Sequence, residues 1–144
     1  KDLIKKIINR FSNLSYIKAQ YISSQQEAFE GNEVELVPTI IFKGGLSYRK
    51  KSFQISYQYS YTSEQFTDAT NADFSSNAVF GLVPEYTVMD LSAKYWYLKK
   101  WIIEAGVNNL SNEIYFTRRA SGYPGPGIIP SDPRNFYLTL GLKM

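Results

Sequence analysis

One segment of this chain alternates between apolar and polar side chains over ten consecutive residues, from Phe53 to Thr62. The apolar or aromatic positions are Phe53, Ile55, Tyr57, Tyr59 and Tyr61, and the polar positions between them are Gln54, Ser56, Gln58, Ser60 and Thr62. A helix does not produce this pattern, because its side chains return to the same face about every 3.6 residues, whereas a β-strand places neighbouring side chains on opposite faces. The segment is therefore predicted to be a strand with one apolar and one polar face.

Apolar residues at every second position recur along most of the chain. This pattern predicts six long strands, at residues 11–23, 38–49, 53–65, 86–98, 101–110 and 134–144. The first is the weakest, because Leu14 and Tyr16 break the parity set by the residues that follow them. The preceding segment, Lys1–Arg10, spaces its apolar residues like a helix of one or two turns. Since so short a helix is marginal by itself, we interpret the segment as a turn leading into the first strand.

The connections between these strands alternate in length. Those at 50–52 and 99–100 are tight, whereas those at 24–37, 66–85 and 111–133 are long. Transmembrane β-barrels alternate in this way, because the turns on one side of the membrane are short and the loops on the other side are long. The strands are also long enough to cross a bilayer at a tilt. We therefore favour a membrane barrel over a soluble β-sheet, although the alternation of side chains alone is compatible with both.

The two faces of the predicted sheet have distinct roles in a membrane barrel. We expect the aromatic set of 53–61 to face lipid, and Tyr48, Phe53, Tyr97 and Trp101, beside the short turns, to form an interfacial girdle. The polar face is expected to line the lumen, with Glu104 and Asp90 pairing with Lys94 or with a missing plug. The predicted lumen residues are Gln54, Gln58, Asp90, Lys94, Glu104 and Asn108.

Six strands are too few to close a membrane barrel, since the smallest known barrels have about eight. Open edges would leave unpaired N–H and C=O groups in lipid, where nothing can satisfy them. We therefore expect residues 1–144 to be an all-β antiparallel meander of about six long strands, the C-terminal part of a larger transmembrane β-barrel. The remaining strands are expected to lie outside these residues.

Composition excludes several kinds of active site. The chain has no Cys and no His, which removes thiol nucleophiles, His-dependent triads and the usual zinc sites. The carboxylates form no plausible acid–base pair, and the glycines of 122–127 do not match a phosphate-binding loop. We therefore predict no catalytic residues, no metal ligands and no cofactor, and we do not expect an enzyme. The net charge of +3 is too small to predict nucleic-acid binding.

Three segments carry a family resemblance. They are Ser56–Thr70, Gly106–Phe116 with the sequence GVNNLSNEIYF, and Phe116–Leu142, which contains GYPGP and an aromatic-rich last strand. Together they resemble the C-terminal barrel of TonB-dependent outer-membrane receptors, in particular the ferric-citrate and siderophore receptors. The second segment is similar to the family signature G-x-x-N-L-F-D-x-x-Y, with Ser111 and Asn112 in place of Phe and Asp. Met144 stands where the usual final residue is Phe.

The resemblance implies a part of a receptor in the cell outer membrane that takes up a ferric chelate with energy coupling. The partners it implies are outer-membrane lipid, an N-terminal plug and further barrel strands absent from these residues, a TonB-type energy transducer acting through the plug, and the iron chelate. Two alternatives stay open: an outer-membrane channel or receptor for another nutrient, such as an oligosaccharide or cobalamin, and a soluble β-barrel binding protein.

The longest connection, 111–133, holds the candidate ligand-binding residues. They are Tyr115, Arg118, Arg119 and Tyr123, with Arg134 just beyond the connection. A guanidinium group binds carboxylates through two parallel hydrogen bonds, and aromatic rings can pack on the apolar edge of a chelate. We expect this loop to be ordered and to fold back toward the lumen. The alternative is that the arginines fix the loop or pair with Asp132 and Glu113.

Overall fold

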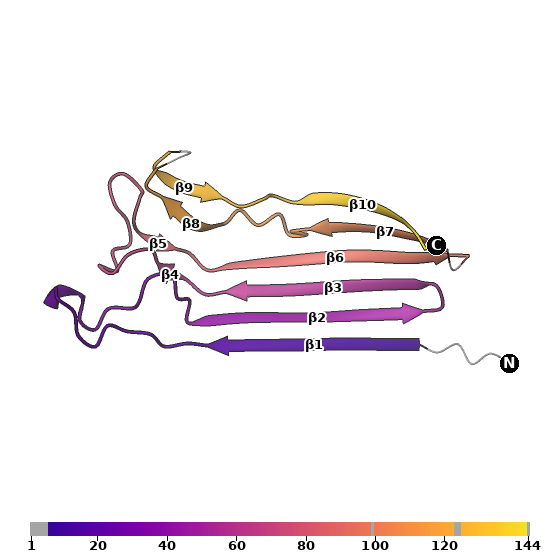
Figure 1. The fold of residues 1–144 in the computed structure, drawn as a ribbon, viewed down its shortest axis with the longest axis horizontal. Helices are drawn as coiled ribbons and strands as arrows, with labels where there is room; N and C mark the ends of the chain where they lie inside the picture. Colours follow the sequence, from indigo (N-terminus) through magenta and orange to yellow (C-terminus); the bar gives the residue numbers. More distant parts are fainter. Residues whose placement is uncertain (1–5, 99, 123–124, 144) are drawn as a thin grey trace.

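The computed structural model describes residues 6–98, 100–122 and 125–143. Its main element is an antiparallel sheet of six strands. These are β1 (Lys6–Tyr16), β2 (Ile40–Lys50), β3 (Phe53–Thr62), β6 (Tyr86–Tyr97), β7 (Trp101–Asn108) and β10 (Asn135–Leu142). The strands lie side by side in the order in which they follow each other along the chain (Figure 1). The predicted all-β meander of six long strands is confirmed.

The prediction for the first strand was wrong in its position. The strand was expected at 11–23, but β1 begins at Lys6 and ends at Tyr16. Lys6–Arg10, interpreted as part of a turn, pair instead with β2, as far as Lys6 opposite Lys50. β2 offers backbone hydrogen-bonding groups along its full length, and pairing with them makes Lys6–Arg10 part of the strand. This pairing outweighs the weak local preference indicated by the spacing of apolar residues. Leu14 and Tyr16, which broke the assumed parity, lie opposite Phe42 and Ile40.

The long connections contain short elements that the alternation did not predict. The first holds a single turn of 3-10 helix, η1 (Glu27–Phe29). The second holds β4 (Gln65–Phe66) and β5 (Leu82–Val83), and the third holds β8 (Phe116–Ala120) and β9 (Gly127–Pro130), each pair forming a small antiparallel sheet. All three connections lie at the same end of the main sheet (Figure 1). In the described part of the chain, no helix is long and apolar enough to cross a membrane.

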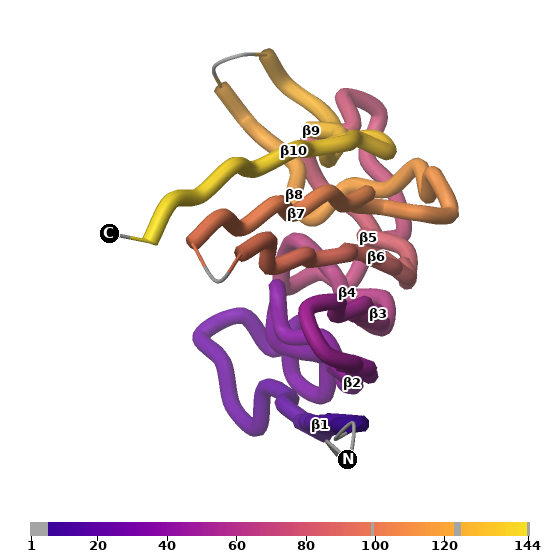
Figure 2. Tube along the Cα trace, turned by 90° about the vertical axis from the view of Figure 1, so that its right-hand side faces the viewer, coloured from indigo at the N-terminus to yellow at the C-terminus, as the bar shows by residue number. Residues whose placement is uncertain are grey.

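The register of the main sheet brings most apolar residues of the six strands to one face, with exceptions such as Phe11 on β1 and Ile102 on β7. One row across the sheet joins Leu46, Tyr57, Leu91, Val107 and Phe136. A row on the opposite face, three positions closer to the short turns, joins Arg49, Gln54, Lys94, Glu104 and Thr139. The cavities along the sheet are lined mainly by this polar face, so the polar face is the hollow side. Seen along the strands, the sheet follows an arc (Figure 2).

The apolar face has no protein packed against it in the described part of the chain. Val83, in a loop sheet, is the one apolar side chain there that is fully buried, whereas Leu138 and Leu140 on β10 are each 68% exposed. A soluble monomer exposes apolar patches of only a few hundred Å². An apolar face that spans six strands is instead the lipid-facing surface expected of a barrel wall.

Aromatic residues edge this apolar face at both ends. Tyr48, Phe53, Tyr97 and Trp101 lie on it beside the short turns, where the girdle was predicted, and Tyr95 lies next to Phe53 across β3 and β6. Toward the long loops, the face carries a second set, Tyr16, Phe42, Tyr59, Tyr61 and Phe136. Between the two sets the face is mainly aliphatic, with Tyr57 and the charged side chain of Arg10 in the same row as Leu46. This order matches the apolar band and two interfacial girdles of an outer-membrane barrel.

Candidate functional site

Arg119 joins two of the long connections at the loop end of the sheet. Its guanidinium group donates a hydrogen bond from Nη1 to the carbonyl of Ala78 at 3.0 Å and another from Nη2 to the carbonyl of Leu82 at 2.8 Å. The same group lies over the ring of Phe116, 5.2 Å from its centre. Both Nη atoms of Arg119 thus donate to main-chain oxygens of the neighbouring loop. For Arg119, these contacts support the alternative role considered from the sequence, which is to fix the loop.

Arg118 differs from Arg119 in its surroundings. It is exposed, and within the described residues its side chain has neither a hydrogen bond nor an ion pair. It lines an open cavity of about 130 Å³ together with Arg119. The other residues around this cavity are Leu36, Thr67, Val79, Phe80 and Ser121. The cavity therefore combines one free guanidinium group with an apolar wall and two hydroxyl groups.

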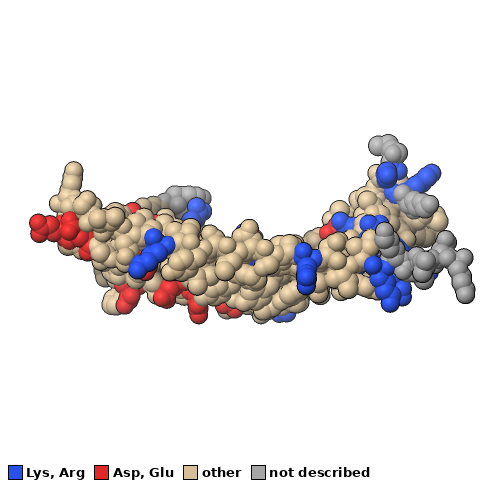
Figure 3. All heavy atoms as spheres, turned by 90° about the horizontal axis from the view of Figure 1, so that it is seen from below, with Lys and Arg blue, Asp and Glu red and all other residues tan. Residues whose placement is uncertain are grey.

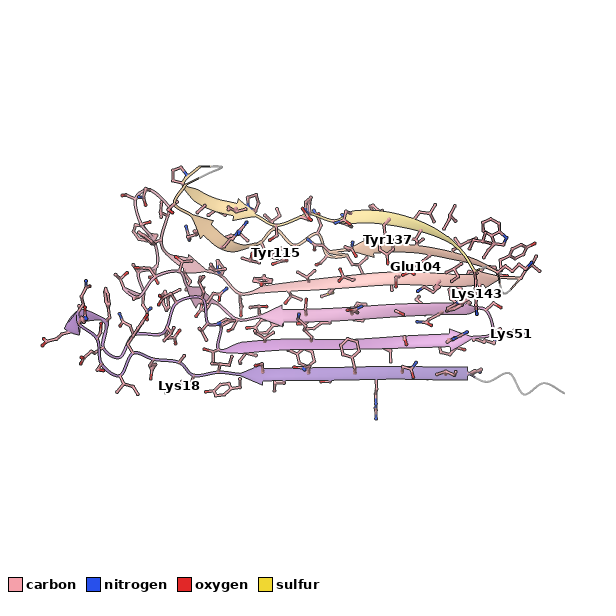
Figure 4. The ribbon with its side chains drawn as sticks, in the orientation of Figure 1. Lys18, Lys51, Glu104, Tyr115, Tyr137 and Lys143 are labelled. Atoms are coloured by element: carbon pink, nitrogen blue, oxygen red, sulfur yellow. The ribbon has the colours of Figure 1, made fainter. Side chains whose placement is uncertain are left out.

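The other candidate residues lie at the base of the loop or outside the described residues. Tyr115 stacks on Tyr86, with ring centres 4.7 Å apart and planes inclined by 26°. Arg134 directs Nη1 to the carbonyl of Leu110 at 3.4 Å, and its own N–H donates to Asn112 Oδ1 at 3.0 Å. Tyr123 lies outside the described residues. The structure therefore brings Arg118 and Arg119 to one cavity, while Tyr115 (labelled in Figure 4) and Arg134 pack where the loop leaves the sheet.

The expected ion pairs of the arginines with Asp132 and Glu113 do not form within the described residues, where Lys94–Glu104 is the single ion pair. Asp132 and Glu113 instead offer their main-chain carbonyls to the side chain of Asn109, at 3.3 and 2.9 Å. The side-chain amide of Asn109 thus holds both ends of the loop, and the arginines of the loop form their contacts with other residues.

Asn109 is a structural centre that the sequence did not identify. It is buried, with 3% of its surface exposed, and has a positive φ of 53°. Besides donating to the carbonyls of Glu113 and Asp132, its side chain accepts a hydrogen bond from the N–H of Glu113 at 2.8 Å. Its own N–H donates to Asp90 Oδ1 at 2.9 Å. The signal was present in the segment Gly106–Phe116, because asparagine is among the few residues that tolerate a left-handed conformation while bonding to nearby backbone.

The hollow face carries one linked set of polar side chains on β6, β7 and β10. Lys94 Nζ lies 2.7 Å from Glu104 Oε2, as predicted for Glu104, and the hydroxyl of Tyr137 donates to Glu104 Oε1 at 3.3 Å. Asp90, for which the same partner was considered, binds the N–H of Asn109 instead. The Tyr137 ring lies over Gly106, where an added Cβ would be 2.5 Å from the ring; Figure 4 labels Tyr137 and its partner Glu104. Gly106 is therefore required for the position of Tyr137.

Charge is divided between the two ends of the sheet. Acidic side chains gather at the loop end, and several lysines lie at the end with the short turns (Figure 3). Some of the loop carboxylates have internal partners: Tyr21 donates to Glu35 Oε2 at 2.6 Å, which raises the pKa of the Tyr21 hydroxyl. Within the described residues, no group of three or more acidic side chains is arranged to hold a metal ion. The contact with Tyr21 fixes Glu35 within the first long connection.

Comparisons with known proteins agree with this geometry. The sequence model of the family described as "TonB dependent receptor-like, beta-barrel" matches residues 7–110 of the 144. No curated protein matches the chain. Among solved structures, the ferric citrate transporter FecA in its unliganded form is similar, with a TM-score of 0.84 and 21% identity over 94% of this chain and 21% of that chain.

Two further receptors share the fold. The ferric-catecholate import receptor Fiu from E. coli K12, in its closed form, has a TM-score of 0.74 and 19% identity over 94% of this chain and 18% of its own. The siderophore receptor PiuA from Acinetobacter baumannii has a TM-score of 0.72 and 19% identity over 94% of this chain and 19% of its own. The chain thus spans about a fifth of the length of each of these three proteins.

Proposed function

Because the chain belongs to the TonB-dependent receptor β-barrel family, we propose that it is part of the wall of an outer-membrane receptor for energy-coupled uptake of a ferric chelate. In this proposal residues 1–144 are the C-terminal β-barrel portion, and the remaining strands and the plug belong to the rest of the receptor. A TonB-type transducer acts through that plug. We assign the chain a part in transport and no catalytic activity, since its family consists of receptors.

The observation that carries the membrane location is the uncovered apolar face of the main sheet. It spans all six strands and is edged by aromatic side chains at both ends. Such a face is stable only against lipid or another apolar surface, because exposing it to water would cost about 25 cal/mol for each Å². Outer-membrane lipid is therefore the proposed environment of this face.

The ferric chelate is proposed from the fold and from the loop cavity. The receptors that share the fold are described as a ferric citrate transporter, a ferric-catecholate import receptor and a siderophore receptor. Ferric citrate and ferric siderophores are chelates with anionic oxygen donors, which a free guanidinium group can bind. Arg118 supplies such a group beside the apolar side chains of Val79 and Phe80.

We divide the candidate residues by role. Arg118 is proposed to contact the chelate directly, and Tyr123 from the same loop is proposed as a second contact. Arg119 holds the loop that presents Arg118, since both of its Nη atoms are already bound to carbonyls. Tyr115 and Arg134 are proposed to support the base of this loop, through the ring of Tyr86 and the carbonyl of Leu110.

Calorimetric titration of the intact receptor with ferric citrate and with a ferric catecholate siderophore tests this proposal. Arg118→Ala should weaken binding of the recognised chelate by roughly 10- to 150-fold, because a charge-assisted hydrogen bond is worth about 1.5–3 kcal/mol. Lys18→Ala, which removes an exposed cation from another connection, should leave the affinity unchanged. Equal affinity in the Arg118 variant would exclude this residue as a contact. Binding of an oligosaccharide or cobalamin, but of no ferric chelate, would favour a receptor for another nutrient.

A further inference from the structure

Two lysines face each other at the end of the sheet that carries the short turns. Lys6 on β1 and Lys50 on β2 are register partners, so their side chains leave the same face at the same level. That face is the apolar one, because Lys6 is two residues from Ile8 and Lys50 is two residues from Tyr48, so each lysine lies on the same face as that apolar residue. Like charges directly opposite each other on neighbouring strands destabilise a sheet. A negatively charged group beside the two ammonium groups would therefore stabilise the pair.

The described residues supply no counter-charge to this pair. Both lysines are exposed, and neither forms an ion pair within the part of the chain that the structure describes. Lys51 follows in the tight turn, exposed and with a positive φ of 54°. A second group of cations lies along the same end, where the N–H of Lys143 donates to the carbonyl of Lys100 at 2.8 Å. Figure 4 shows Lys51 and Lys143 at this end of the sheet. We call these five lysines the basic rim: Lys6, Lys50, Lys51, Lys100 and Lys143.

The basic rim has a fixed level relative to the aromatic girdle. Lys50 lies opposite Phe53, and Phe53 lies opposite Tyr95, so the lysine pair continues the row in which the girdle begins. In a membrane, aromatic girdles lie at the boundary between hydrocarbon and headgroups, and lysine side chains extend from there toward the headgroup layer. The ammonium groups of Lys6 and Lys50 are therefore placed at the level of lipid phosphates.

We propose that the Lys6–Lys50 pair binds the phosphate of an anionic phospholipid headgroup in the leaflet on the short-turn side. The phosphate offers several oxygen acceptors, enough for both ammonium groups, and removes the repulsion between them. A lipid with net negative charge is preferred over a zwitterionic one, because the amine of a zwitterionic headgroup opposes the rim. This inference rests on the proposed membrane location.

An anionic lipid fits better than an acidic soluble protein because the two lysines are on the lipid-facing side. A soluble partner would approach the basic rim from the water beyond the short turns. Ile8 and Tyr48, which lie next to the lysine pair, instead face hydrocarbon. The occupant must therefore combine an anionic head with an apolar tail, which is the chemistry of a phospholipid.

The test uses the intact receptor, purified in a zwitterionic detergent and titrated with phosphatidylglycerol or phosphatidylethanolamine, with bound lipids counted by native mass spectrometry. The variants are the double substitution Lys6→Gln with Lys50→Gln and, as a matched control, Lys43→Gln. Lys43 is an exposed lysine on β2 that lies on the polar face. Each lysine near an anionic lipid contributes about fivefold in affinity, so the double variant should bind phosphatidylglycerol about 25-fold more weakly while the control is unchanged.

Salt provides a readout that does not depend on any variant. Binding of phosphatidylglycerol to the unchanged receptor should fall as the NaCl concentration rises, because the ammonium groups are exposed to solvent. Equal phosphatidylglycerol affinity in the double variant, or equal binding of the two lipids, would overturn the lipid site and leave an acidic soluble partner as the alternative. Failure of the unchanged receptor to insert into liposomes would instead contradict the proposed membrane location.

Discussion

Arg119 and Leu82 are 37 positions apart in the chain, yet the guanidinium Nη2 of Arg119 lies 2.8 Å from the main-chain oxygen of Leu82. The same group binds the carbonyl of Ala78, so one side chain fastens β8 to the loop that precedes β6. The two long connections therefore behave as one unit at the end of the sheet, and the cavity beside Arg118 is formed by both of them together with Leu36 of the first connection.

Replacing Arg119 with alanine should loosen this unit without unfolding the sheet. Two hydrogen bonds from a charged donor are lost, each worth about 1.5–3 kcal/mol, so the local stability of the loops should fall by about 3–6 kcal/mol. Hydrogen exchange measured by mass spectrometry should speed up in residues 67–82 and 116–130. Arg118→Ala is the control and should leave exchange in both segments unchanged, because its side chain has no bond to them. Unchanged exchange in the Arg119 variant would show that the loops are held by other contacts.

Asn109 should be less tolerant of alanine than of glycine. Alanine removes the side-chain bonds to Glu113 and Asp132 and also strains a backbone held at φ 53°, at a combined cost of about 2–4 kcal/mol. Glycine removes the same bonds but accepts the positive φ, so its cost should be lower by about 1 kcal/mol. Urea unfolding of the receptor in detergent measures both. Equal losses for the two variants would mean that backbone strain plays no part.

Gly106→Ala should displace the ring of Tyr137. An added Cβ would lie 2.5 Å from that ring, so the ring must move away from Glu104 or the strands must separate, at about 1–3 kcal/mol. Gly141→Ala is the matched control, since the nearest atom to its added Cβ is Ile102 Cβ at an ordinary 3.5 Å. The same unfolding experiment should show recovery when Gly106→Ala is combined with Tyr137→Ala. A double variant as unstable as Gly106→Ala alone would contradict this steric explanation.

The substitution Leu138→Arg tests whether the apolar face contacts lipid or water. Leu138 is 68% exposed on β10 and lies on the row that contains Ala105 and Ala93. In a bilayer, an arginine on the lipid-facing side should destabilise the folded barrel by up to about 2–4 kcal/mol, with the largest cost at the midplane, as measured by folding into liposomes. Thr139→Arg, the next residue but on the polar face, should have a much smaller effect. If Leu138→Arg folds as well as the unchanged receptor, this face does not contact lipid.

Several parts of the fold were predictable because they depend on local alternation. The strand at Phe53–Thr62 was placed correctly at its first residue, and the short turns and long loops were assigned to opposite ends. The first strand was misplaced, since Lys6–Arg10 has no alternation strong enough to show its pairing with β2. The pair Lys94 and Glu104 was also predictable, because both residues lie on the polar face of adjacent strands.

The candidate site was predictable only as a region. The sequence indicated the loop and its two adjacent arginines, but it could not distinguish a bound Arg119 from a free Arg118, because the partners Ala78 and Leu82 come from another loop. Asn109 was missed for the same reason: two of its partners lie at opposite ends of the longest connection.

The amino-acid sequence by itself determined five of the six long strands, their faces and the separation of short turns from long loops. Each of these follows from the period-two alternation of side chains, which is a property of neighbouring residues. The tertiary structure alone decided the register at Lys6 and Lys50, the role of Arg119 and the environment of Asn109. These depend on hydrogen bonds and charges between residues far apart in the chain. Only the folded backbone brings such groups within reach.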